Sequence, residues 1–250
     1  MCEDLVMISN ISRSTHRPKT LRKVLIIIPA FNEEAVIAKV VNRVRTIKSM
    51  HYKLHVCVVN DGSTDSTSEI AREISDVVID LPINLGVGSA VRAGYQYALK
   101  HKFEFVIQID ADDQHNPEYI PSMIDKLSDH DHLVGSRYLD REGYKISKIV
   151  RAAQIIVSLL MYFLHGIRIS DPTSGFRASG HRAIKLLADS YPTTFLQDTI
   201  GSIILVNNEK LVLGEINTPM KPRIIGQSSQ GTLRRVRLYL LSILLIIFWR

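Results

Sequence analysis

Cysteine is scarce in this sequence, since its 250 residues include only Cys2 and Cys57. Two cysteines provide neither the disulfide framework of a small secreted domain nor the ligand spacing of a zinc site. Cys57 lies within an apolar run, where a small buried thiol is expected. The sequence therefore excludes a disulfide-stabilised scaffold and a cysteine-based zinc centre.

Long apolar segments are also missing. Residues 1–20 form a polar, basic tail without the apolar core of a cleavable export signal, so we expect the catalytic part to face the cytoplasm. Near the other end, three arginines precede the apolar run Leu238–Trp249, which is well short of the roughly 20 residues that cross a bilayer. This composition predicts a helix at residues 230–250 that lies on an anionic membrane surface or, alternatively, is buried in an oligomer.

Neither common glycine-rich phosphate motif is complete. No G-x-x-x-x-G-K-[ST] loop occurs, and Gly86-Val-Gly88 lacks the third glycine of a dinucleotide-binding G-x-G-x-x-G. The formal charge of +6 favours an anionic partner, such as a nucleotide, nucleic acid or an acidic membrane surface. Because the basic residues gather beside apolar segments without interleaved aromatic residues that stack on bases, we do not expect nucleic acid binding.

What the sequence does contain is a regular alternation of strand and helix patterns. Continuous apolar runs at Lys23–Pro29, Leu54–Val59 and Phe103–Asp110 predict strands that are covered on both faces, and apolar residues at helical spacing follow them. Such alternation implies a largely parallel sheet with crossover helices. With 46% hydrophobic residues, the segment 21–229 is long enough for one globular domain with a sizeable core.

Polar clusters follow three of the predicted strands. They are Asn32-Glu33-Glu34, Asp61-Gly62-Ser63 and Asp110-Ala111-Asp112. Carboxyl ends of parallel strands meet at one edge of a sheet, where ligands bind, so we expect these clusters to lie close together. Asp110 and Asp112 are two residues apart and can point the same way. Such a carboxylate pair predicts a Mg²⁺ or Mn²⁺ site completed by phosphate oxygens and water.

A purely structural interpretation of these acidic residues is the alternative. They can solvate a turn in front of a helix, with Asn116 as its N-cap and Pro117 in its first position. Asn32 can likewise cap a helix that begins at Glu33. Because three such clusters are expected at the same edge, we favour the binding site.

Seven motifs, taken in order, resemble those of the family 2 glycosyltransferases, in the subgroup of dolichyl-phosphate mannose synthase and the bacterial polyprenyl-phosphate sugar transferases. This resemblance extends from about Val24 to Ser229. It implies the α/β glycosyltransferase-A fold, with a mostly parallel central sheet flanked by helices, a Rossmann-like nucleotide-binding half and a C-terminal amphipathic or apolar helix. The motifs are Ile28–Glu34, Val59–Ser63, Asn84–Gly88, Asp110–Asp112, Gly135–Arg137, Asp171–Arg177 and Arg223–Ser228.

The resemblance also implies roles for individual residues on the donor side. A nucleoside-diphosphate sugar would be the donor, and Asp61 would bond its base. A Mg²⁺ or Mn²⁺ ion on Asp110 and Asp112 would neutralise the leaving diphosphate, which makes Asp112 a catalytic residue. The other residues expected to line the nucleotide-sugar pocket are Pro29, Asn32, Glu34 and Gly88.

On the acceptor side the resemblance leaves two chemistries open. A polyprenyl phosphate carries its own negative charge and needs cations, for which Arg137, Arg177, Lys221 and Arg223 are the candidates. A hydroxyl of a lipid-linked saccharide needs a carboxylate that takes its proton, and Asp198 is the candidate base. In both cases we expect inversion by a single in-line displacement.

The expected setting is the cytoplasmic face of a membrane, with peripheral attachment. The expected partners are a lipid-linked acceptor, the membrane surface and either a second copy of the chain or a membrane partner protein. A non-catalytic nucleotide-binding scaffold is the alternative from another class. The retention of Asp61, Asp110 and Asp112 argues against it.

Overall fold

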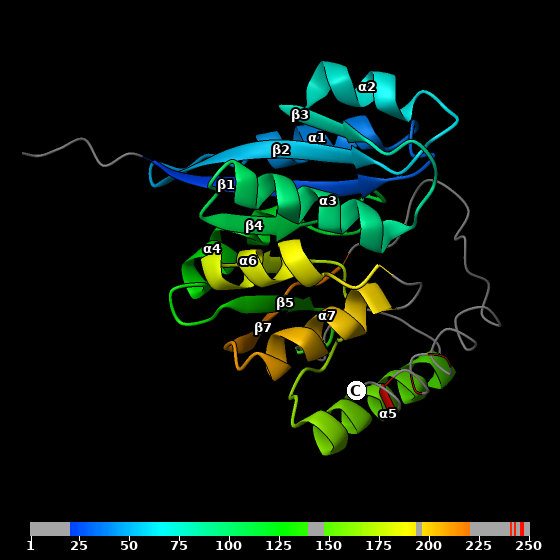
Figure 1. Cartoon of the computed structure of the whole chain (residues 1–250), viewed down its shortest axis with the longest axis vertical. Coiled ribbons are helices and arrows are strands. Elements are labelled where there is room, and N and C mark those ends of the chain that lie inside the picture. Colours follow the sequence, from blue (N-terminus) through cyan, green and yellow to red (C-terminus); the bar gives the residue numbers. More distant parts are fainter. Residues whose placement is uncertain are drawn as a thin grey trace, which may run out of the picture.

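The described residues form seven strands of one sheet, which lies at the centre of the fold (Figure 1). The computed structural model describes residues 21–139, 148–193 and 197–220, together with residues 241, 243, 246 and 247. The strand order is β3-β2-β1-β4-β6-β5-β7. The strands are β1 (Arg22–Ala30), β2 (Tyr52–Asn60), β3 (Val77–Asp80), β4 (Phe105–Gln108), β5 (His132–Ser136), β6 (Arg177–Ser179) and β7 (Leu213–Asn217).

All strand pairs are parallel except the two that β6 makes with β4 and β5. The predicted mostly parallel sheet is therefore confirmed. Strand β6 was not predicted, because its three residues are too few to show a period and follow a loop rich in proline, glycine and serine.

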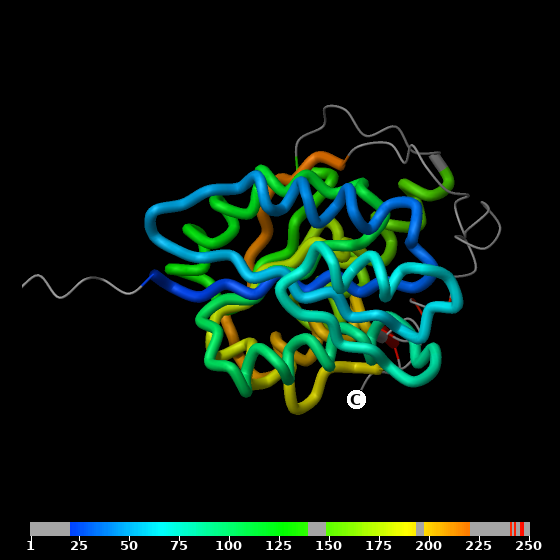
Figure 2. Tube along the Cα trace, turned by 90° about the horizontal axis from the view of Figure 1, so that it is seen from above, coloured from blue at the N-terminus to red at the C-terminus, as the bar shows by residue number. Residues whose placement is uncertain are grey.

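Helices cover both faces of the sheet. In Figure 2, α1 and α4 lie along one face and α3 and α6 along the other. The helices are α1 (Ile37–Arg45), α2 (Thr67–Ile74), α3 (Val87–Lys100), α4 (Ile120–Lys126), α5 (Lys148–His165), α6 (His181–Ser190) and α7 (Gln197–Asn208), with a 3-10 turn η1 (Pro117–Tyr119) before α4.

Strand β1 shows why the chain folds into these layers. Its residues from Val24 to Ile28 are all fully buried. Val24, Ile26 and Ile28 join the core cluster under α1 and α4, whereas Leu25 and Ile27 join the cluster under α3 and α6. Successive side chains point to opposite faces of a strand, so a strand covered on both faces must be apolar at every position.

Two predicted helix caps have different outcomes. Asn116 is the N-cap of η1, its side chain accepts the backbone N–H of Glu118, and Pro117 occupies the first position, as the turn interpretation predicts. Asn32 does not cap a helix, because α1 begins only at Ile37 after Val36. The backbone of Asn32 has a φ of +54° instead, a conformation that asparagine tolerates better than most residues.

Helix α5 lies at the β7 end of the molecule, far from α2 (Figure 1). Most of the predicted C-terminal helix, residues 230–250, falls outside the described residues. The part that is described returns to α5: Ile246 is buried in a cluster with Val157 and Met161, and His165 Nε2 lies 3.0 Å from the Ile246 carbonyl oxygen. Within the described residues, we find no helix with the length and apolarity needed to cross a membrane.

Candidate active site at the carboxyl edge of the sheet

The loops that follow β1 and β2 are tied together at the carboxyl edge of the sheet. Asn32 donates its backbone N–H to Ser63 Oγ at 2.9 Å, and its side-chain Oδ1 accepts the backbone N–H of Thr64 at 2.9 Å. Glu34 Oε2 accepts the backbone N–H of Ser66. Two of the predicted polar clusters are thus adjacent, as the parallel topology requires.

Asp61 joins this surface to the glycine-bearing loop before α3. It is buried, and its two carboxylate oxygens accept the backbone N–H groups of Leu85 at 2.8 Å and Gly86 at 2.9 Å. Gly86 has a φ of +89°, which L-residues rarely adopt. Asp61 therefore braces the loop that leads into α3, and its predicted bond to a nucleotide base stays a prediction.

Asp110 is held between a histidine and a glycine. His115 Nε2 lies 3.0 Å from its Oδ2, and a Cβ atom on Gly175 would come within 2.4 Å of both of its oxygens. The side chain is nevertheless 37% exposed. Burial by itself would raise the pKa of Asp110, but the hydrogen bond from His115 and the charges of His115, Arg177 and Arg137 together lower it. Asp110 is therefore kept ionised.

Asp113, the third acid of this stretch, anchors the loop to α1. It pairs with Lys39 at 2.7 Å and with Arg43, and its backbone has a φ of +59°. Although burial raises the pKa of Asp113, its bonds to Lys39 and Arg43 lower it overall. Asp112 differs, since its Oδ1 accepts the backbone N–H of Gln114 at 3.1 Å. The structure thus separates a structural acid, Asp113, from the two that were predicted to bind a cation.

Asp198 lies in the first turn of α7, within reach of the same site. The Cβ atom of Asp198 would be 3.3 Å from a Cβ atom on Gly88, the first-turn glycine of α3. Burial is the main cause that raises the pKa of Asp198, and the nearby charge of Asp110 raises it further, against the lowering effect of Arg177. A carboxyl whose pKa is shifted toward neutrality is suited to accept a proton.

Arg177 was predicted to contact a phosphate, yet its side chain is fully buried. Its guanidinium group donates to the carbonyl oxygens of Ser174 at 2.9 Å and Pro172 at 3.2 Å, and to Ser202 Oγ. A phosphate has no access to Arg177 in this conformation. Its positive charge acts on the site through the pKa values of Asp110 and Asp198, both of which it lowers.

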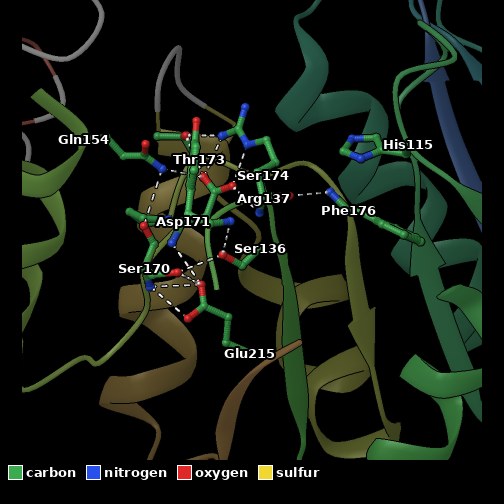
Figure 3. A network of polar contacts seen from close by, with 12 residues as sticks. His115, Ser136, Arg137, Gln154, Ser170, Asp171, Thr173, Ser174, Phe176 and Glu215 are labelled. Atoms are coloured by element: carbon green, nitrogen blue, oxygen red, sulfur yellow. Dashed lines mark hydrogen bonds and ion pairs between the residues drawn. The ribbon is translucent and has the colours of Figure 1, made fainter. Parts of the chain in front are cut away.

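Arg137 is paired with Asp171 at the end of β5. Its Nε and one terminal nitrogen donate to the two oxygens of Asp171, at 2.5 Å and 2.6 Å, and the Asp171 side chain is fully buried. Figure 3 shows Gln154 of α5 on the other side of Asp171, donating from 3.2 Å. Asp171 therefore links β5 to α5.

Glu215 of β7 supports this link from below (Figure 3). Its carboxylate accepts the backbone N–H groups of Ser170 and Asp171, each at 2.9 Å, and the hydroxyl of Ser170 at 2.8 Å. The loop that contains Asp171 is thus fixed by a strand that the sequence places more than 40 residues further along.

A cavity of about 470 Å³ lies beside this network, between α5 and the chain before Asp171. Neither Asp110 nor Asp112 lines this cavity. Apolar side chains of α5 form one wall, and Arg151 and Arg168 add positive charge. Its lining residues are Arg151, Gln154, Ile155, Ser158, Leu159, Tyr162, Ile167, Arg168, Ile169, Ser170 and Glu215.

The acidic pair fits a hard divalent cation, although it does not enclose one. Oxygen ligands suit Mg²⁺ and Mn²⁺. Because Gly175 has no side chain, the Asp110 carboxylate can occupy space that a Cβ atom at this position would fill. Within the described part of the chain, no cluster of three or more histidine, cysteine, aspartate or glutamate residues forms a metal cage. The remaining ligands would come from phosphate oxygens and water.

Several residues at this edge have no separate signal in the sequence. His115, Gly175 and Glu215 reach it from the loop after β4, the loop before β6 and β7, so only folding brings them together. Pro29, at the carboxyl end of β1, lies opposite Val59 of β2 in the register. Lys221 and Arg223, predicted to bind phosphate, lie outside the described residues.

Comparison with solved structures shows the fold. The fold matches that of glucosyl-3-phosphoglycerate synthase from Mycobacterium tuberculosis, solved with Mn²⁺, UDP and glucosyl-3-phosphoglycerate, with a TM-score of 0.64 over 89% of this chain and 80% of that one at 20% identity. This likeness shows the fold, and it confirms the predicted α/β glycosyltransferase-A fold with its mostly parallel sheet, whereas the predicted C-terminal helix stays a prediction.

The sequence comparisons identify the family. The profile described as Glycosyl transferase family 2 matches residues 25–188, so the chain belongs to this family, as its motifs predict. An uncharacterized protein of Methanocaldococcus jannaschii is 31% identical over 84% of this chain and 86% of its own length. A UDP-N-acetylglucosamine–dolichyl-phosphate N-acetylglucosaminyltransferase of Methanococcus voltae is 27% identical over 77% of this chain and 83% of its own length.

Proposed function

We propose that this glycosyltransferase moves a sugar from a nucleoside-diphosphate donor to a polyprenyl phosphate at a membrane surface, with inversion of the anomeric centre. The observation that carries the proposal is the convergence of Asp110, Asp112 and the loops after β1 and β2 at the carboxyl edge of the sheet. The name of the Methanococcus voltae relative, a dolichyl-phosphate transferase, supports the choice of acceptor.

On the donor side, Asp110 and Asp112 would hold Mg²⁺ or Mn²⁺ against the diphosphate. When bound, the cation supplies positive charge where the leaving nucleoside diphosphate becomes more negative. The chain itself keeps Asp110 ionised through His115 and through the charges of Arg177 and Arg137. The Asn32 loop and the loop that Asp61 braces would flank the nucleotide.

On the acceptor side, the α5 surface supports a lipid. Ile155, Ile156, Leu159 and Phe163 are exposed by 47%, 48%, 48% and 73%, and the cavity with Arg151 and Arg168 opens beside them. Cations next to exposed apolar side chains are suited to an anionic lipid headgroup and its chain. This side of the molecule would attach peripherally to the membrane, at its cytoplasmic face.

A second acceptor chemistry has an observation in its favour. The raised pKa of Asp198, and its position beside Gly88, suit a general base for a hydroxyl of a lipid-linked saccharide. A phosphate acceptor needs no such base, because it already carries negative charge. The requirement for an ionised Asp198 therefore separates the two acceptors.

The proposal is tested by assaying a panel of nucleotide sugars with polyprenyl phosphate as acceptor, in the presence and absence of Mn²⁺. We expect transfer that requires the cation, and we expect the double variant Asp110→Asn/Asp112→Asn to lose at least about a thousandfold in rate, since a catalytic cation supplies several kcal/mol. Cation-independent transfer, or an active double variant, would contradict the proposal. A retained anomeric configuration would exclude the single displacement.

A further inference from the structure

His115 is a buried residue next to the acidic pair, in the loop after β4. It is 2% exposed, its Nε2 lies 3.0 Å from Asp110 Oδ2, and its Nδ1 has no hydrogen-bond partner among the described residues. An ionised carboxylate can only accept a hydrogen bond. Nε2 of His115 therefore carries a proton and donates it to the hydrogen bond with Asp110.

The position of His115 does not depend on that hydrogen bond. Its ring packs against Phe176, with 5.2 Å between the ring centroids, and Phe176 is fully buried. Its backbone carbonyl oxygen accepts from Arg43 at 3.4 Å, and Arg43 also donates to the neighbouring Asn116 Oδ1 at 3.1 Å. His115 is thus held by α1 through its backbone and by Phe176, the residue before β6, through its ring.

Two neighbours consequently restrict the orientation of the Asp110 carboxylate. His115 holds Oδ2, and the backbone of Gly175 is so close that a Cβ atom there would lie 2.4 Å from each oxygen. Among the described residues, hydrogen bonds reach only Oδ2, so Oδ1 is left for another ligand. The Asp110 side chain is 37% exposed, so the carboxylate is partly accessible.

We propose that His115 is a positioning residue for cation binding: its Nε2–H fixes Oδ2 of Asp110 so that Oδ1 faces the ion. The inference rests on the cation site of the proposed function and adds a residue to it. Partners that orient a metal-binding side chain typically change metal affinity by about 10- to 100-fold when they are removed.

The experiment compares His115→Phe with His115→Gln in the full chain. Phenylalanine keeps a ring against Phe176 but has no donor, whereas the amide nitrogen of glutamine can replace Nε2–H. We measure the dissociation constant of Mn²⁺, from the electron paramagnetic resonance of free Mn²⁺, with UDP and then with GDP. We expect His115→Phe to bind Mn²⁺ at least about tenfold more weakly and His115→Gln to recover most of the loss.

Thermal unfolding without metal separates positioning from folding. Because Nδ1 of His115 is buried and has no hydrogen-bond partner in the part of the chain that the structure describes, removing the imidazole should not lower the melting temperature of His115→Phe. Equal Mn²⁺ affinity in the wild type and in His115→Phe would overturn the inference, as would a loss that parallels a lower melting temperature.

The same measurements give a different result if the proposed function itself is wrong. If the wild type itself binds no Mn²⁺ with either nucleotide, the cation site is wrong. The positioning role is then decided by the metal-free crystal structure of His115→Phe. A reoriented Asp110 carboxylate would support the role of His115, and an unchanged carboxylate would exclude it.

Discussion

At the residue scale, the environment of Asp198 combines two opposing influences. Its burial and the charge of Asp110 favour the neutral acid, whereas Arg177 favours the carboxylate, and the net result is a raised pKa. The positive charge of the buried Arg177 thus limits how far the pKa of Asp198 is raised. Neither neighbour is near Asp198 in the sequence, so only the fold determines its protonation behaviour.

Replacing Asp198 by asparagine tests both its chemistry and its ionisation. With a polyprenyl phosphate acceptor, we expect Asp198→Asn to retain activity within about tenfold, because no proton has to be removed; with a hydroxyl acceptor, the loss should reach about 10²- to 10⁴-fold. Initial rates with each acceptor provide the measurement. A large loss on polyprenyl phosphate would contradict the proposed acceptor.

The same variant should alter the pH dependence of stability. Since the folded-state pKa of Asp198 lies above its unfolded value, ionisation opposes folding. This penalty is absent below the ordinary aspartate pKa and complete above the raised one. Asp198→Asn should therefore be more stable than the wild type near neutral pH, and the difference in unfolding free energy from urea titrations should vanish as the pH falls to about 3. A difference in unfolding free energy that does not change with pH would contradict the raised pKa of Asp198.

A second prediction at the residue scale concerns Gly175. A methyl group there would meet both oxygens of Asp110 at 2.4 Å, so Gly175→Ala should displace the carboxylate and reduce transfer by at least about tenfold. Gly180→Ala is the matched control, because its nearest contacts would be at 3.7 Å and 3.9 Å. Steady-state rates and circular dichroism of both variants provide the measurement. Equal transfer rates in Gly175→Ala and Gly180→Ala would show that a displaced Asp110 carboxylate does not reduce activity.

At the element scale, α5 has large apolar side chains on its exposed side as well as on its buried side. One side packs on the core through Val157 and Met161, whereas Ile156 and Phe163 are among several large apolar residues exposed on the other side. The described C-terminal residue Ile247 is also exposed, by 49%. The exposed apolar side chains are concentrated on the helix that also lines the cavity.

We expect this helix to bind anionic vesicles. The double variant Ile156→Glu/Phe163→Glu should bind vesicles that contain phosphatidylglycerol at least about 100-fold more weakly, because burying each side chain contributes about 1.5–3 kcal/mol. Met50→Glu/Ile83→Glu changes two residues that are 89% and 62% exposed elsewhere, and serves as the control. Vesicle sedimentation measures the affinities. Equal losses in the two double variants would exclude α5 as the membrane contact.

At the scale of the whole molecule, strand β6 lies between β4, which leads to the acidic pair, and β5, which leads to Arg137. Its antiparallel pairing with β4 and β5 places Arg177 opposite Gln108 of β4 and Val134 of β5. The loop before β6 supplies Asp171 to Arg137 and Gly175 to Asp110. A single short strand therefore connects the acidic pair with α5 and β7.

The Arg137–Asp171 pair should be important for the stability of this junction. Arg137→Met leaves the fully buried Asp171 without its cation and should cost about 3–5 kcal/mol. The matched change Arg182→Met removes an arginine that is 63% exposed from Asp131, and should cost less than about 1 kcal/mol. Guanidinium titrations give both values. Similar losses would show that the junction does not depend on this pair.

Much of the architecture was predictable from the sequence. The apolar runs at β1 and β2 are continuous because both faces of a parallel sheet are covered, and that composition is visible without a structure. The strand–helix alternation then placed the loops with Asn32, Asp61 and Asp110 at one edge. The buried thiol of Cys57 was predicted in the same way and is confirmed.

What the sequence by itself determined is therefore the fold class, the family and the edge at which polar residues gather, because these depend on local periodicity and on short ordered motifs. Only the tertiary structure decided that Asp113 is bound to α1, that Arg177 is buried, and that His115 and Gly175 contact the Asp110 carboxylate. These contacts join segments far apart in the chain. Their strength depends on distance and burial, which no local pattern encodes.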